Sequence, residues 1–422
     1  MSGARRIFRI PGRFGMRRGG ALDEVQVAYE SWGELNAARD NAVLIFTGLS
    51  PSAHAASSAA DPTPGWWEEM IGPSRPIDTR RFHVICVNSL GSCFGSTGPA
   101  SPDPATGAPY RLDFPVLTLE DVAAAGRRLL EHLGIDVLHT LVGPSMGGMT
   151  ALAYAAQNPG KARRLLLISC AARALPYAIA LRSLQREMVL QDPAFAAGRY
   201  DAAAGPLPGM RMARKLGMIT YRSAREWEQR FGRERIAQER QGGDGYAPDF
   251  EIESYLEANA QKFIGQFDPA CYLALSRASD LFDLAEHGGS VAAGLGRLGV
   301  ETAMVIGVET DVLYPIHQQR ELAAGLAQAG VPVVLEELPC IQGHDAFLVD
   351  MDRFRPPVAR FFAQDQPRRR GLLGQLLDDG RLDAALPESR VQHRARLHIA
   401  GAADHRAGHR IADDGIAALQ GP

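Results

Sequence analysis

The stretch Leu141-Val142-Gly143-Pro144-Ser145-Met146-Gly147-Gly148-Met149 decides the fold of this chain. An apolar run at 137–142 precedes the motif, and a helix-forming run at 150–157 follows it. The pattern G-x-S-x-G is typical of a sharp strand-to-helix turn that exposes the serine hydroxyl beside the positive end of the helix. The same pattern also occurs by chance in glycine-rich turns. The flanking strand and helix nevertheless favour Ser145 as a nucleophile.

Buried strands alternate with helices on both sides of this motif. Continuous apolar runs predict strands buried on both faces, and residues 25–30 alternate as one further strand. A capping box at Thr118 and Asp121 predicts a helix that ends at Gly134. This alternation is typical of a mostly parallel sheet with helical crossovers. The buried strands are expected at 42–46, 82–87, 137–142, 164–169 and 302–307, and further helices at 150–157, 317–329 and 353–362. A last strand is expected at 331–335, where Pro332 should lie at the strand's start or on a sheet edge, because it cannot donate to a ladder.

The alternation stops after residue 170. Helical patterns separated by Pro- and Gly-rich breaks follow, at 178–190, 224–231 and 252–263. They predict a helical lid over the carboxyl edge of the sheet. After Gln364 the composition shifts to Arg, Ala, Gly, His and Asp, which is typical of an accessory, poorly ordered tail. The expected domains are a core of residues 1–170 and 295–364, a lid of residues 171–294 and a tail of residues 365–422.

Composition argues against several classes of protein. The 422 residues carry a formal net charge of -3 and a pI near 6.4, which gives no reason to expect a nucleic-acid partner. No apolar run reaches the length of a membrane span, and no apolar segment follows the N-terminal arginines as a signal peptide requires. The five cysteines are scattered without a C-x-x-C pair, so we expect no metal site and a reducing cytoplasm.

Two late segments supply partners for Ser145. In α/β-hydrolase folds the catalytic acid and then the histidine follow the nucleophile, each in the loop after a strand. Asp311 lies in the loop after the strand at 302–307, and it is a better candidate than Glu309, which lies nearer the strand. His344 follows the last predicted strand. We therefore predict an α/β-hydrolase fold, with the lid inserted between the nucleophile half and the half that holds Asp311 and His344.

The predicted triad points to acyl transfer. His344 would take the proton of Ser145 so that the serine Oγ attacks an acyl carbon, while Asp311 orients the imidazole. The resulting oxyanion needs two backbone N–H donors, one from the residue after the nucleophile and one from the turn after the strand at 42–46. The candidate donors are Met146 for the first, and Phe46 or Thr47 for the second.

Four motifs together resemble the homoserine O-acetyltransferase family of α/β-hydrolase-fold acyltransferases. The resemblance runs from about residue 9 to residue 362, and the set is far more specific than G-x-S-x-G alone. The motifs are Ala28-Tyr29-Glu30-Ser31-Trp32-Gly33-Glu34-Leu35-Asn36, Val87-Asn88-Ser89-Leu90-Gly91-Ser92-Cys93, Gly143-Pro144-Ser145-Met146-Gly147-Gly148-Met149 and Gly343-His344-Asp345-Ala346-Phe347-Leu348.

Other details depart from the acetyltransferase pattern. Acetyltransferases usually have Leu-Thr-Gly-Asp after the first buried strand and Gly-Gly-Ser-Met at the elbow. This chain has Thr47-Gly48-Leu49-Ser50-Pro51 and Gly143-Pro144-Ser145, and Pro339-Cys340-Ile341-Gln342-Gly343 stands before the histidine. These variants look like the serine O-succinyltransferase branch, whose product O-succinylserine feeds cysteine synthesis. The resemblance implies a substrate-specificity loop formed by Leu49, Ser50, Pro51 and Ser52.

The resemblance also implies residues that bind the substrates. The family uses an arginine on the first lid helix for the amino acid carboxylate, and Arg186 falls at that position; an arginine fork suits a carboxylate. The family's aspartate after the catalytic histidine pairs with the substrate ammonium, and Asp345 matches it. Arg182 lies one helical turn before Arg186 and would take the succinyl carboxylate, which acetyl donors lack. The alternative for Arg182 is a solvated lid arginine.

The expected reaction is ping-pong transfer of a succinyl group from succinyl-CoA to L-serine through an ester on Ser145. CoA enters as a co-substrate, and no bound cofactor is expected. Family resemblance suggests a homodimer through the lid helices. The alternatives are homoserine O-acyltransfer in methionine synthesis, an esterase with the same triad, and a partner-binding scaffold in which the tail is the working part.

Overall fold

One large sheet lies at the centre of the computed structural model, which describes residues 4–201, 205–237 and 246–364. The last six of its eight strands pair in parallel, whereas the second strand pairs antiparallel with both of its neighbours. In spatial order they are β1 (Arg6–Arg9), β4 (Gln26–Trp32), β8 (His83–Val87), β5 (Ala42–Phe46), β9 (Leu138–Pro144), β10 (Ala162–Ile168), β11 (Thr302–Val308) and β12 (Val333–Leu338). Two small pairs accompany them: β2 (Phe14–Gly15) with β3 (Ala21–Leu22), and β6 (Ile71–Gly72) with β7 (Ile77–Asp78).

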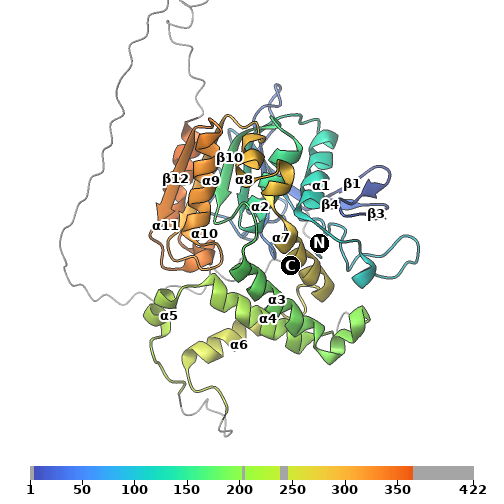
Figure 1. Ribbon diagram of the computed structural model, residues 1–422, viewed down its shortest axis with the longest axis vertical. Coiled ribbons are helices and arrows are strands. Elements are labelled where there is room, and N and C mark those ends of the chain that lie inside the picture. Colours follow the sequence, from blue (N-terminus) through green and yellow to red (C-terminus); the bar gives the residue numbers. More distant parts are fainter. Residues whose placement is uncertain (1–3, 202–204, 238–245, 365–422) are drawn as a thin grey trace, which may run out of the picture.

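Helices cover both faces of this sheet (Figure 1). Successive residues of β5 face opposite sides, since Leu44 and Phe46 join one hydrophobic cluster while Val43 and Ile45 join the other. Burial of both faces explains why the parallel strands are continuous apolar runs. One face is covered by α1 (Leu119–His132), α2 (Met146–Gln157), α8 (Val291–Gly296) and α9 (Ile316–Gln328), and the other by α10 (Ala346–Val349) and α11 (Met351–Ala363).

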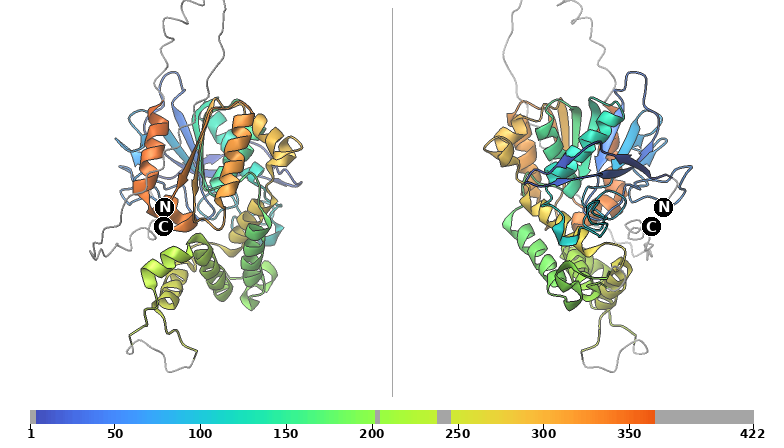
Figure 2. Two further views of the ribbon diagram at one scale, coloured as in Figure 1. Left: turned by 60° about the vertical axis from the view of Figure 1, so that its left-hand side comes forward. Right: turned by 90° about the vertical axis from the view of Figure 1, so that its right-hand side faces the viewer.

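A group of helices lies beyond one end of the sheet, as Figure 2 shows from two sides. The sequence predicted three of its members and missed two, α4 and α7. The start of the last of them, α7, is tied to the core, because Arg111 Nη1 donates to Oδ2 of its N-cap residue Asp268 at 2.8 Å. The group comprises α3 (Pro176–Leu190), α4 (Leu207–Tyr221), α5 (Ala224–Phe231), α6 (Glu251–Phe263) and α7 (Pro269–Leu281).

Short 3-10 turns complete the elements: η1 (Arg111–Asp113), η2 (Pro193–Gly198), η4 (Leu284–His287) and η5 (Gly343–Asp345). The predicted capping box is present, since Thr118 Oγ1 accepts from the Asp121 N–H and the Asp121 carboxylate accepts from the Thr118 N–H. Within the described residues, no helix is long and apolar enough to cross a membrane. The predicted tail, residues 365–422, lies outside the described residues.

Candidate active site

Ser145 occupies the sharp turn between β9 and α2, with φ 54° and ψ −126°. A positive φ is uncommon outside glycine. The turn can close because the residues two positions before and after Ser145 are glycines. A Cβ on Gly143 would lie 2.2 Å from the Gly147 carbonyl oxygen, and a Cβ on Gly147 would lie 2.1 Å from the Phe46 carbonyl oxygen. The glycines of the motif are therefore required by close backbone packing.

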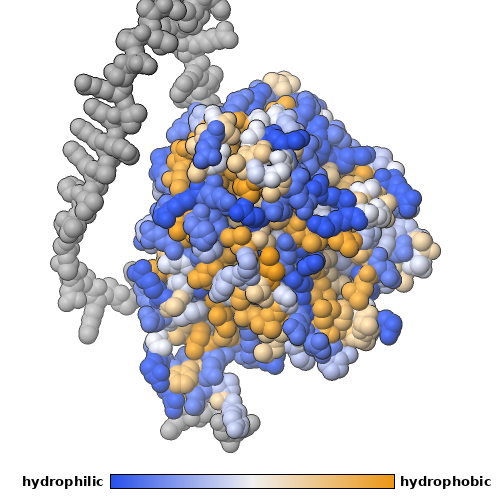
Figure 3. All heavy atoms as spheres, in the orientation of Figure 1, coloured by the Kyte–Doolittle hydropathy of each residue, from blue (hydrophilic) through white to orange (hydrophobic). Residues whose placement is uncertain are grey.

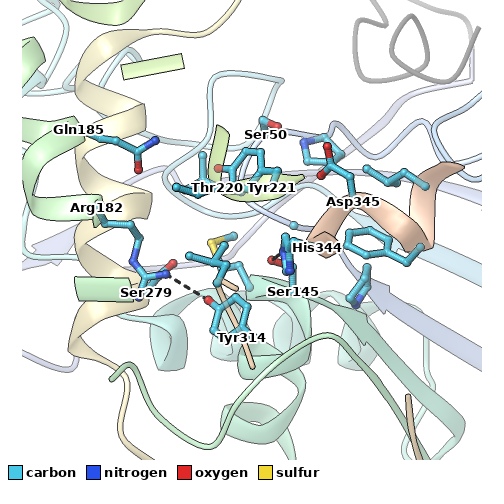
Figure 4. A pocket seen from close by; sticks show the side chains of 18 of the residues that line it. Ser50, Ser145, Arg182, Gln185, Thr220, Tyr221, Ser279, Tyr314, His344 and Asp345 are labelled. Carbon is cyan, nitrogen blue, oxygen red and sulfur yellow. Dashed lines mark hydrogen bonds between the residues drawn. The ribbon is translucent and has the colours of Figure 1, made fainter. Parts of the chain in front are cut away.

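The structure brings the three predicted triad residues into one hydrogen-bonded chain. His344 Nε2 lies 2.8 Å from Ser145 Oγ (Figure 4). On the other side of the ring, His344 Nδ1 lies 2.8 Å from Asp311 Oδ2. Because a carboxylate only accepts, Nδ1 carries the proton and Nε2 is free to accept from the serine hydroxyl. The second oxygen of Asp311 accepts the backbone N–H groups of Leu313 and Tyr314, both at 2.9 Å. These bonds fix the carboxylate behind the imidazole.

The environment of His344 favours its charged form. Burial lowers its pKa, but the charge of Asp311, the hydrogen bond to Asp311 and the charge of Asp345 outweigh burial. The net result is that the pKa of His344 lies above its ordinary value. A group with such a pKa can receive the serine proton readily, provided that it starts neutral.

The loop that carries His344 is packed against the lid. Gly343 has φ 69° and its N–H donates to Thr310 Oγ1 at 3.1 Å. A Cβ at this position would lie 2.9 Å from backbone atoms of Arg222 and Ser223, which follow α4. The Ser223 hydroxyl donates to the carbonyl of Ile341 in the same loop. The position of the histidine therefore depends on the end of α4.

A cavity with about 810 Å³ of empty space opens above Ser145, between the sheet edge and the lid. Asp345 lines it, and its Oδ2 accepts from Arg222 Nε at 3.3 Å. Core residues in its wall include Gly48, Leu49, Ser50, Pro51, Trp66, Met146, Tyr314 and Phe347, and the lid supplies Arg182, Gln185, Arg214, Thr220, Tyr221, Tyr272 and Ser279.

The predicted oxyanion donors lie in two places. Met146 lines the cavity beside Ser145. Phe46 and Thr47 are not among the lining residues, and their carbonyl oxygens lie against Gly147. The chain reaches the cavity at the next residue, Gly48. Which N–H of this turn serves as the second donor stays a prediction.

The predicted specificity loop contributes three of its four residues to the cavity wall. Leu49, Ser50 and Pro51 line it, but Ser52 does not. The Ser52 carbonyl instead accepts from Trp66 Nε1 at 3.1 Å, and this bond ties the loop to a tryptophan that also lines the cavity.

Arg182 is a buried cavity residue, with 6% of its surface exposed, so it is not a solvated lid arginine. Its Nε donates to Asp280 Oδ1 at 2.6 Å and its Nη1 donates to the Tyr314 hydroxyl at 3.2 Å. The buried Nη2 has no hydrogen-bond partner in the described part of the chain. Since a buried guanidinium N–H normally has an acceptor, this edge is suited to an anionic ligand.

Arg186 does not line the cavity. Its Nη1 lies 2.7 Å from Asp280 Oδ2 and donates to Ser276 Oγ at 2.9 Å. Asp280 on α7 thus holds both arginines of α3, and it draws Arg186 away from the substrate space. The prediction that Arg186 binds the amino acid carboxylate receives no support from this placement.

Sequence reasoning missed Arg214, which lines the cavity from α4. Its guanidinium carbon lies 4.7 Å from the centre of the Phe263 ring, and its buried Nε has no hydrogen-bond partner among residues 4–201, 205–237 and 246–364. The available signal was the helical spacing of Met210, Ala213 and Gly217, which form the buried side of α4.

Comparison with known proteins identifies the family. A sequence profile described as the alpha/beta hydrolase fold matches residues 41–350. The chain belongs to the α/β-hydrolase family. The predicted fold class is therefore confirmed. Within the described residues of this hydrolase-family chain, no group of three or more His, Cys, Asp or Glu side chains is arranged to hold a metal ion.

Two relatives of this α/β-hydrolase-family protein carry functional names. A protein of Litchfieldella anticariensis named serine O-succinyltransferase is 59% identical over 86% of this chain and 99% of its own length. A protein of Streptomyces lavendulae named L-serine/homoserine O-acetyltransferase is 56% identical over 85% of this chain and 97% of its own length. Several further relatives at 53–56% identity are also named serine O-succinyltransferase.

Solved structures of this family have the same fold. Homoserine O-acetyltransferase from Bacillus anthracis superimposes with a TM-score of 0.78 at 26% identity, over 85% of this chain and 96% of that one. Esterase E22 superimposes with a TM-score of 0.76 at 29% identity, over 85% and 99%. The fold is thus shared between acyl transfer and ester hydrolysis.

Proposed function

We propose that this protein is a serine O-succinyltransferase, which moves a succinyl group from succinyl-CoA to the hydroxyl of L-serine. The observation that carries the proposal is a nucleophile-and-base pair in a cavity that also holds two arginines, Arg182 and Arg214. The product of this reaction has two carboxylates, one from the donor and one from the acceptor. Arg182 and Arg214 match them, because Arg182 Nη2 and Arg214 Nε are buried atoms that have no hydrogen-bond partner within the described residues.

The first half-reaction forms the acyl-enzyme. His344 Nε2 takes the proton of Ser145 as the serine Oγ attacks the thioester carbonyl of succinyl-CoA. Backbone N–H groups from Met146 and from the turn at Phe46 and Thr47 stabilise the tetrahedral oxyanion. The intermediate collapses, the carbon–sulfur bond breaks, and the CoA sulfur leaves with the proton that His344 carried. Succinyl-CoA is a substrate here, and the chemistry requires no bound cofactor.

The second half-reaction transfers the succinyl group. L-serine enters, His344 takes its hydroxyl proton, and the hydroxyl oxygen attacks the ester carbon. The bond between that carbon and Ser145 Oγ then breaks, and His344 returns the proton to Ser145 Oγ. Asp345 pairs with the ammonium of the acceptor, and we assign its carboxylate to Arg214 rather than to Arg186, because Arg214 lines the cavity. The lid covers the ester, so that serine rather than water is the usual acceptor.

Arg182 selects the acyl donor in this proposal. Arg182 lines the cavity, and Asp280 and Tyr314 occupy its Nε and Nη1. Its buried Nη2 has no hydrogen-bond partner among the residues that the structure describes. A succinyl carboxylate supplies the missing acceptor, and an acetyl group does not. Arg182 therefore favours succinyl-CoA over acetyl-CoA as the acyl donor.

The second candidate is acetyl transfer to L-serine or L-homoserine. It is favoured by the relative from Streptomyces lavendulae, which is named L-serine/homoserine O-acetyltransferase and is 56% identical to this chain. Acetyl transfer would use the same triad, and only the acyl donor and the acceptor bound in the cavity would differ. Hydrolysis of simple esters, suggested by the likeness to esterase E22, is the third.

We also propose a homodimer that forms through the lid helices. Exposed apolar residues recur with a spacing of seven on α3, at Tyr177 and Leu184, and on α4, at Met212 and Ile219. A spacing of seven places each pair on one side of its helix. Figure 3 shows apolar side chains gathered over this region of the surface. Since CoA thioesters are intracellular metabolites, we expect the dimer to act in the cytoplasm.

The test is CoA release from succinyl-CoA and acetyl-CoA, each with L-serine and L-homoserine, with the products identified by mass. The proposal expects fast turnover with succinyl-CoA and serine, yielding O-succinylserine. Faster turnover with acetyl-CoA would favour the second candidate, and rapid hydrolysis without transfer would favour the esterase. Ser145→Ala is the control and should release no CoA above background.

A further inference from the structure

A second buried ionic cluster lies outside the triad, between β4 and the loop after β5. The imidazole of His54 is at its centre. His54 Nδ1 lies 2.9 Å from Glu30 Oε2 and 3.9 Å from Asp61 Oδ2, and His54 Nε2 lies 2.9 Å from the Thr63 carbonyl oxygen. Glu30 has 2% of its surface exposed and His54 has 8%. The reaction proposed above uses none of these residues.

The hydrogen bonds indicate that His54 is an imidazolium. Both of its ring nitrogens face oxygens that can only accept, a carboxylate and a carbonyl. The Thr63 hydroxyl lies 3.2 Å from Nε2, but it donates its proton to Asp61 Oδ1 at 2.6 Å. A neutral ring would leave one nitrogen without a donor, and such a loss is costly in a buried site.

Charge around the ring agrees with this assignment. The hydrogen bond to Glu30 raises the pKa of His54 above its ordinary value; burial opposes the shift, and the charges of Glu30 and Asp61 reinforce it. The bond from His54 Nδ1 to Glu30 therefore joins the loop to β4, and the bond from Nε2 to the Thr63 carbonyl holds the ring within the loop.

This cluster anchors the part of the chain that forms one wall of the cavity. Leu49, Ser50 and Pro51 line the cavity a few residues before His54. On the other side, the His54 carbonyl accepts the N–H of Trp66 at 3.3 Å, and Trp66 also lines the cavity. In Figure 4, Ser50 lies on a different side of the cavity from Arg182.

The same loop reaches the histidine of the triad. Trp67 Nε1 donates to the carbonyl of Phe347 at 3.0 Å, and Phe347 packs edge-on against the His344 ring with centroids 5.7 Å apart. The wall held by His54 is thus connected with the part of the cavity where Asp345 lies.

We propose that His54, held as an imidazolium by Glu30, is a positioning residue that fixes the Leu49–Pro51 wall and Trp66 and thereby sets which amino acid is accepted. This inference rests on the acyl transfer proposed above. It assigns His54 to the acceptor step, because the wall lies away from Arg182, the proposed donor-selecting residue. Formation of the acyl-enzyme should depend little on it.

The chain offers a matched control for the test. His287 Nε2 lies 3.0 Å from Glu120 Oε1, and both side chains are as buried as those of the His54–Glu30 pair. His287 does not line the cavity. His54→Gln and His287→Gln therefore each remove a buried His–Glu pair, and only the first should alter the acceptor wall.

The experiment separates the two half-reactions in the full-length chain. Rapid mixing with succinyl-CoA measures the first-turnover burst of CoA, and steady-state rates with L-serine and L-homoserine measure the acceptor step. For His54→Gln we expect the acceptor KM to rise about tenfold and the preference between the two acceptors to narrow, with the burst changed less than about twofold. His287→Gln should leave the acceptor KM and the preference unchanged.

Each result decides the inference. A folded His54→Gln variant with the wild-type acceptor KM and preference overturns it, as does an equal rise of KM in His287→Gln. If His54→Gln does not fold, Glu30→Gln keeps an acceptor oxygen facing the ring and is compared with Glu120→Gln on the same criteria. A wild-type protein that transfers to neither acceptor overturns the proposed function itself, and the inference with it.

Discussion

Ser145 has a backbone conformation that costs on the order of 1–3 kcal/mol outside glycine. It persists because Gly143 and Gly147 allow adjoining backbone segments to close around the turn. The hydroxyl consequently leaves the sheet and meets Nε2 of His344 at 2.8 Å. At this scale, local strain and the geometry of the proposed nucleophile have the same origin.

The pH dependence should follow His344. Burial lowers its pKa, but the charge and hydrogen bond of Asp311 outweigh burial and place the pKa above the ordinary 6.5. The neutral ring is the active form, so kcat/KM for succinyl-CoA should fall as the pH drops through this raised pKa and level off above it. The measurement is initial CoA release across pH. A constant rate down to pH 5 would contradict the role of His344 as the base.

Donor choice should depend on Arg182. Replacement by Lys keeps a positive charge near Asp280 but removes the planar fork, so kcat/KM for succinyl-CoA should fall about ten- to a hundredfold and that for acetyl-CoA much less. Arg186→Lys is the matched control, because Arg186 also pairs with Asp280 but does not line the cavity. If kcat/KM falls equally for both donors in both variants, Arg182 has only a structural role.

The triad positions were accessible from sequence because each residue follows a buried strand in a fixed chain order. The arginines were not. Arg182 and Arg186 lie one turn apart on α3 and both pair with Asp280 on α7, but only Arg182 lines the cavity. Arg214 was not predicted as a site residue because the helix that carries it was not predicted.

At the scale of elements, α4 shows why helices were missed. Its sequence contains Pro208, Gly209 and Gly217, which are typical of breaks. In the structure these glycines are contact points: a Cβ on Gly209 would lie 2.5 Å from the carbonyl oxygen of Met188 on α3, and one on Gly217 would lie 3.0 Å from Gln185 Nε2. A glycine in the sequence can therefore mark either the end of a helix or a point where two helices pack closely, and the local sequence does not distinguish the two. The buried strands and α5, in contrast, were predicted to within a few residues because their patterns are unambiguous.

Gly343 joins the histidine loop to the end of α4, and its replacement tests that joint. Gly343→Ala adds a Cβ 2.9 Å from the backbone of Arg222 and Ser223, at a φ of 69°. We expect a loss of about 1–3 kcal/mol in the free energy of unfolding and a larger proportional loss of transfer, since His344 is displaced. Urea unfolding and CoA release measure the two effects. Gly330→Ala, with φ 80° and open space around it, is the control for strain without contact.

At the scale of the molecule, the sheet separates two hydrophobic clusters. The larger one continues from α1 and α2 into the lid, where Val189, Met210 and Cys271 belong to it. The smaller one lies under α11 and includes Trp67. The apolar residues of the predicted lid therefore share one hydrophobic cluster with those of the sheet.

The proposed dimer depends on the exposed apolar residues of this lid. Leu184→Glu combined with Ile219→Glu should convert the protein to a monomer, because charges would replace two side chains that are 45% and 48% exposed in the single chain. Light scattering after size-exclusion chromatography measures the mass. Val116→Glu, 53% exposed and outside the lid, is the control. A wild-type monomer at micromolar concentration would rule out this interface.

The joint between Gly343 and the end of α4 also bears on how an enzyme can hold an energy-rich ester in water. If α4 swung outward, it would release the loop that keeps His344 against Ser145. Water would then reach the ester at the moment when no base stands ready to activate it. The movement of α4 that would admit water would thus also remove the base that hydrolysis of the ester requires. Hydrolysis of the acyl-enzyme is limited by this coupling.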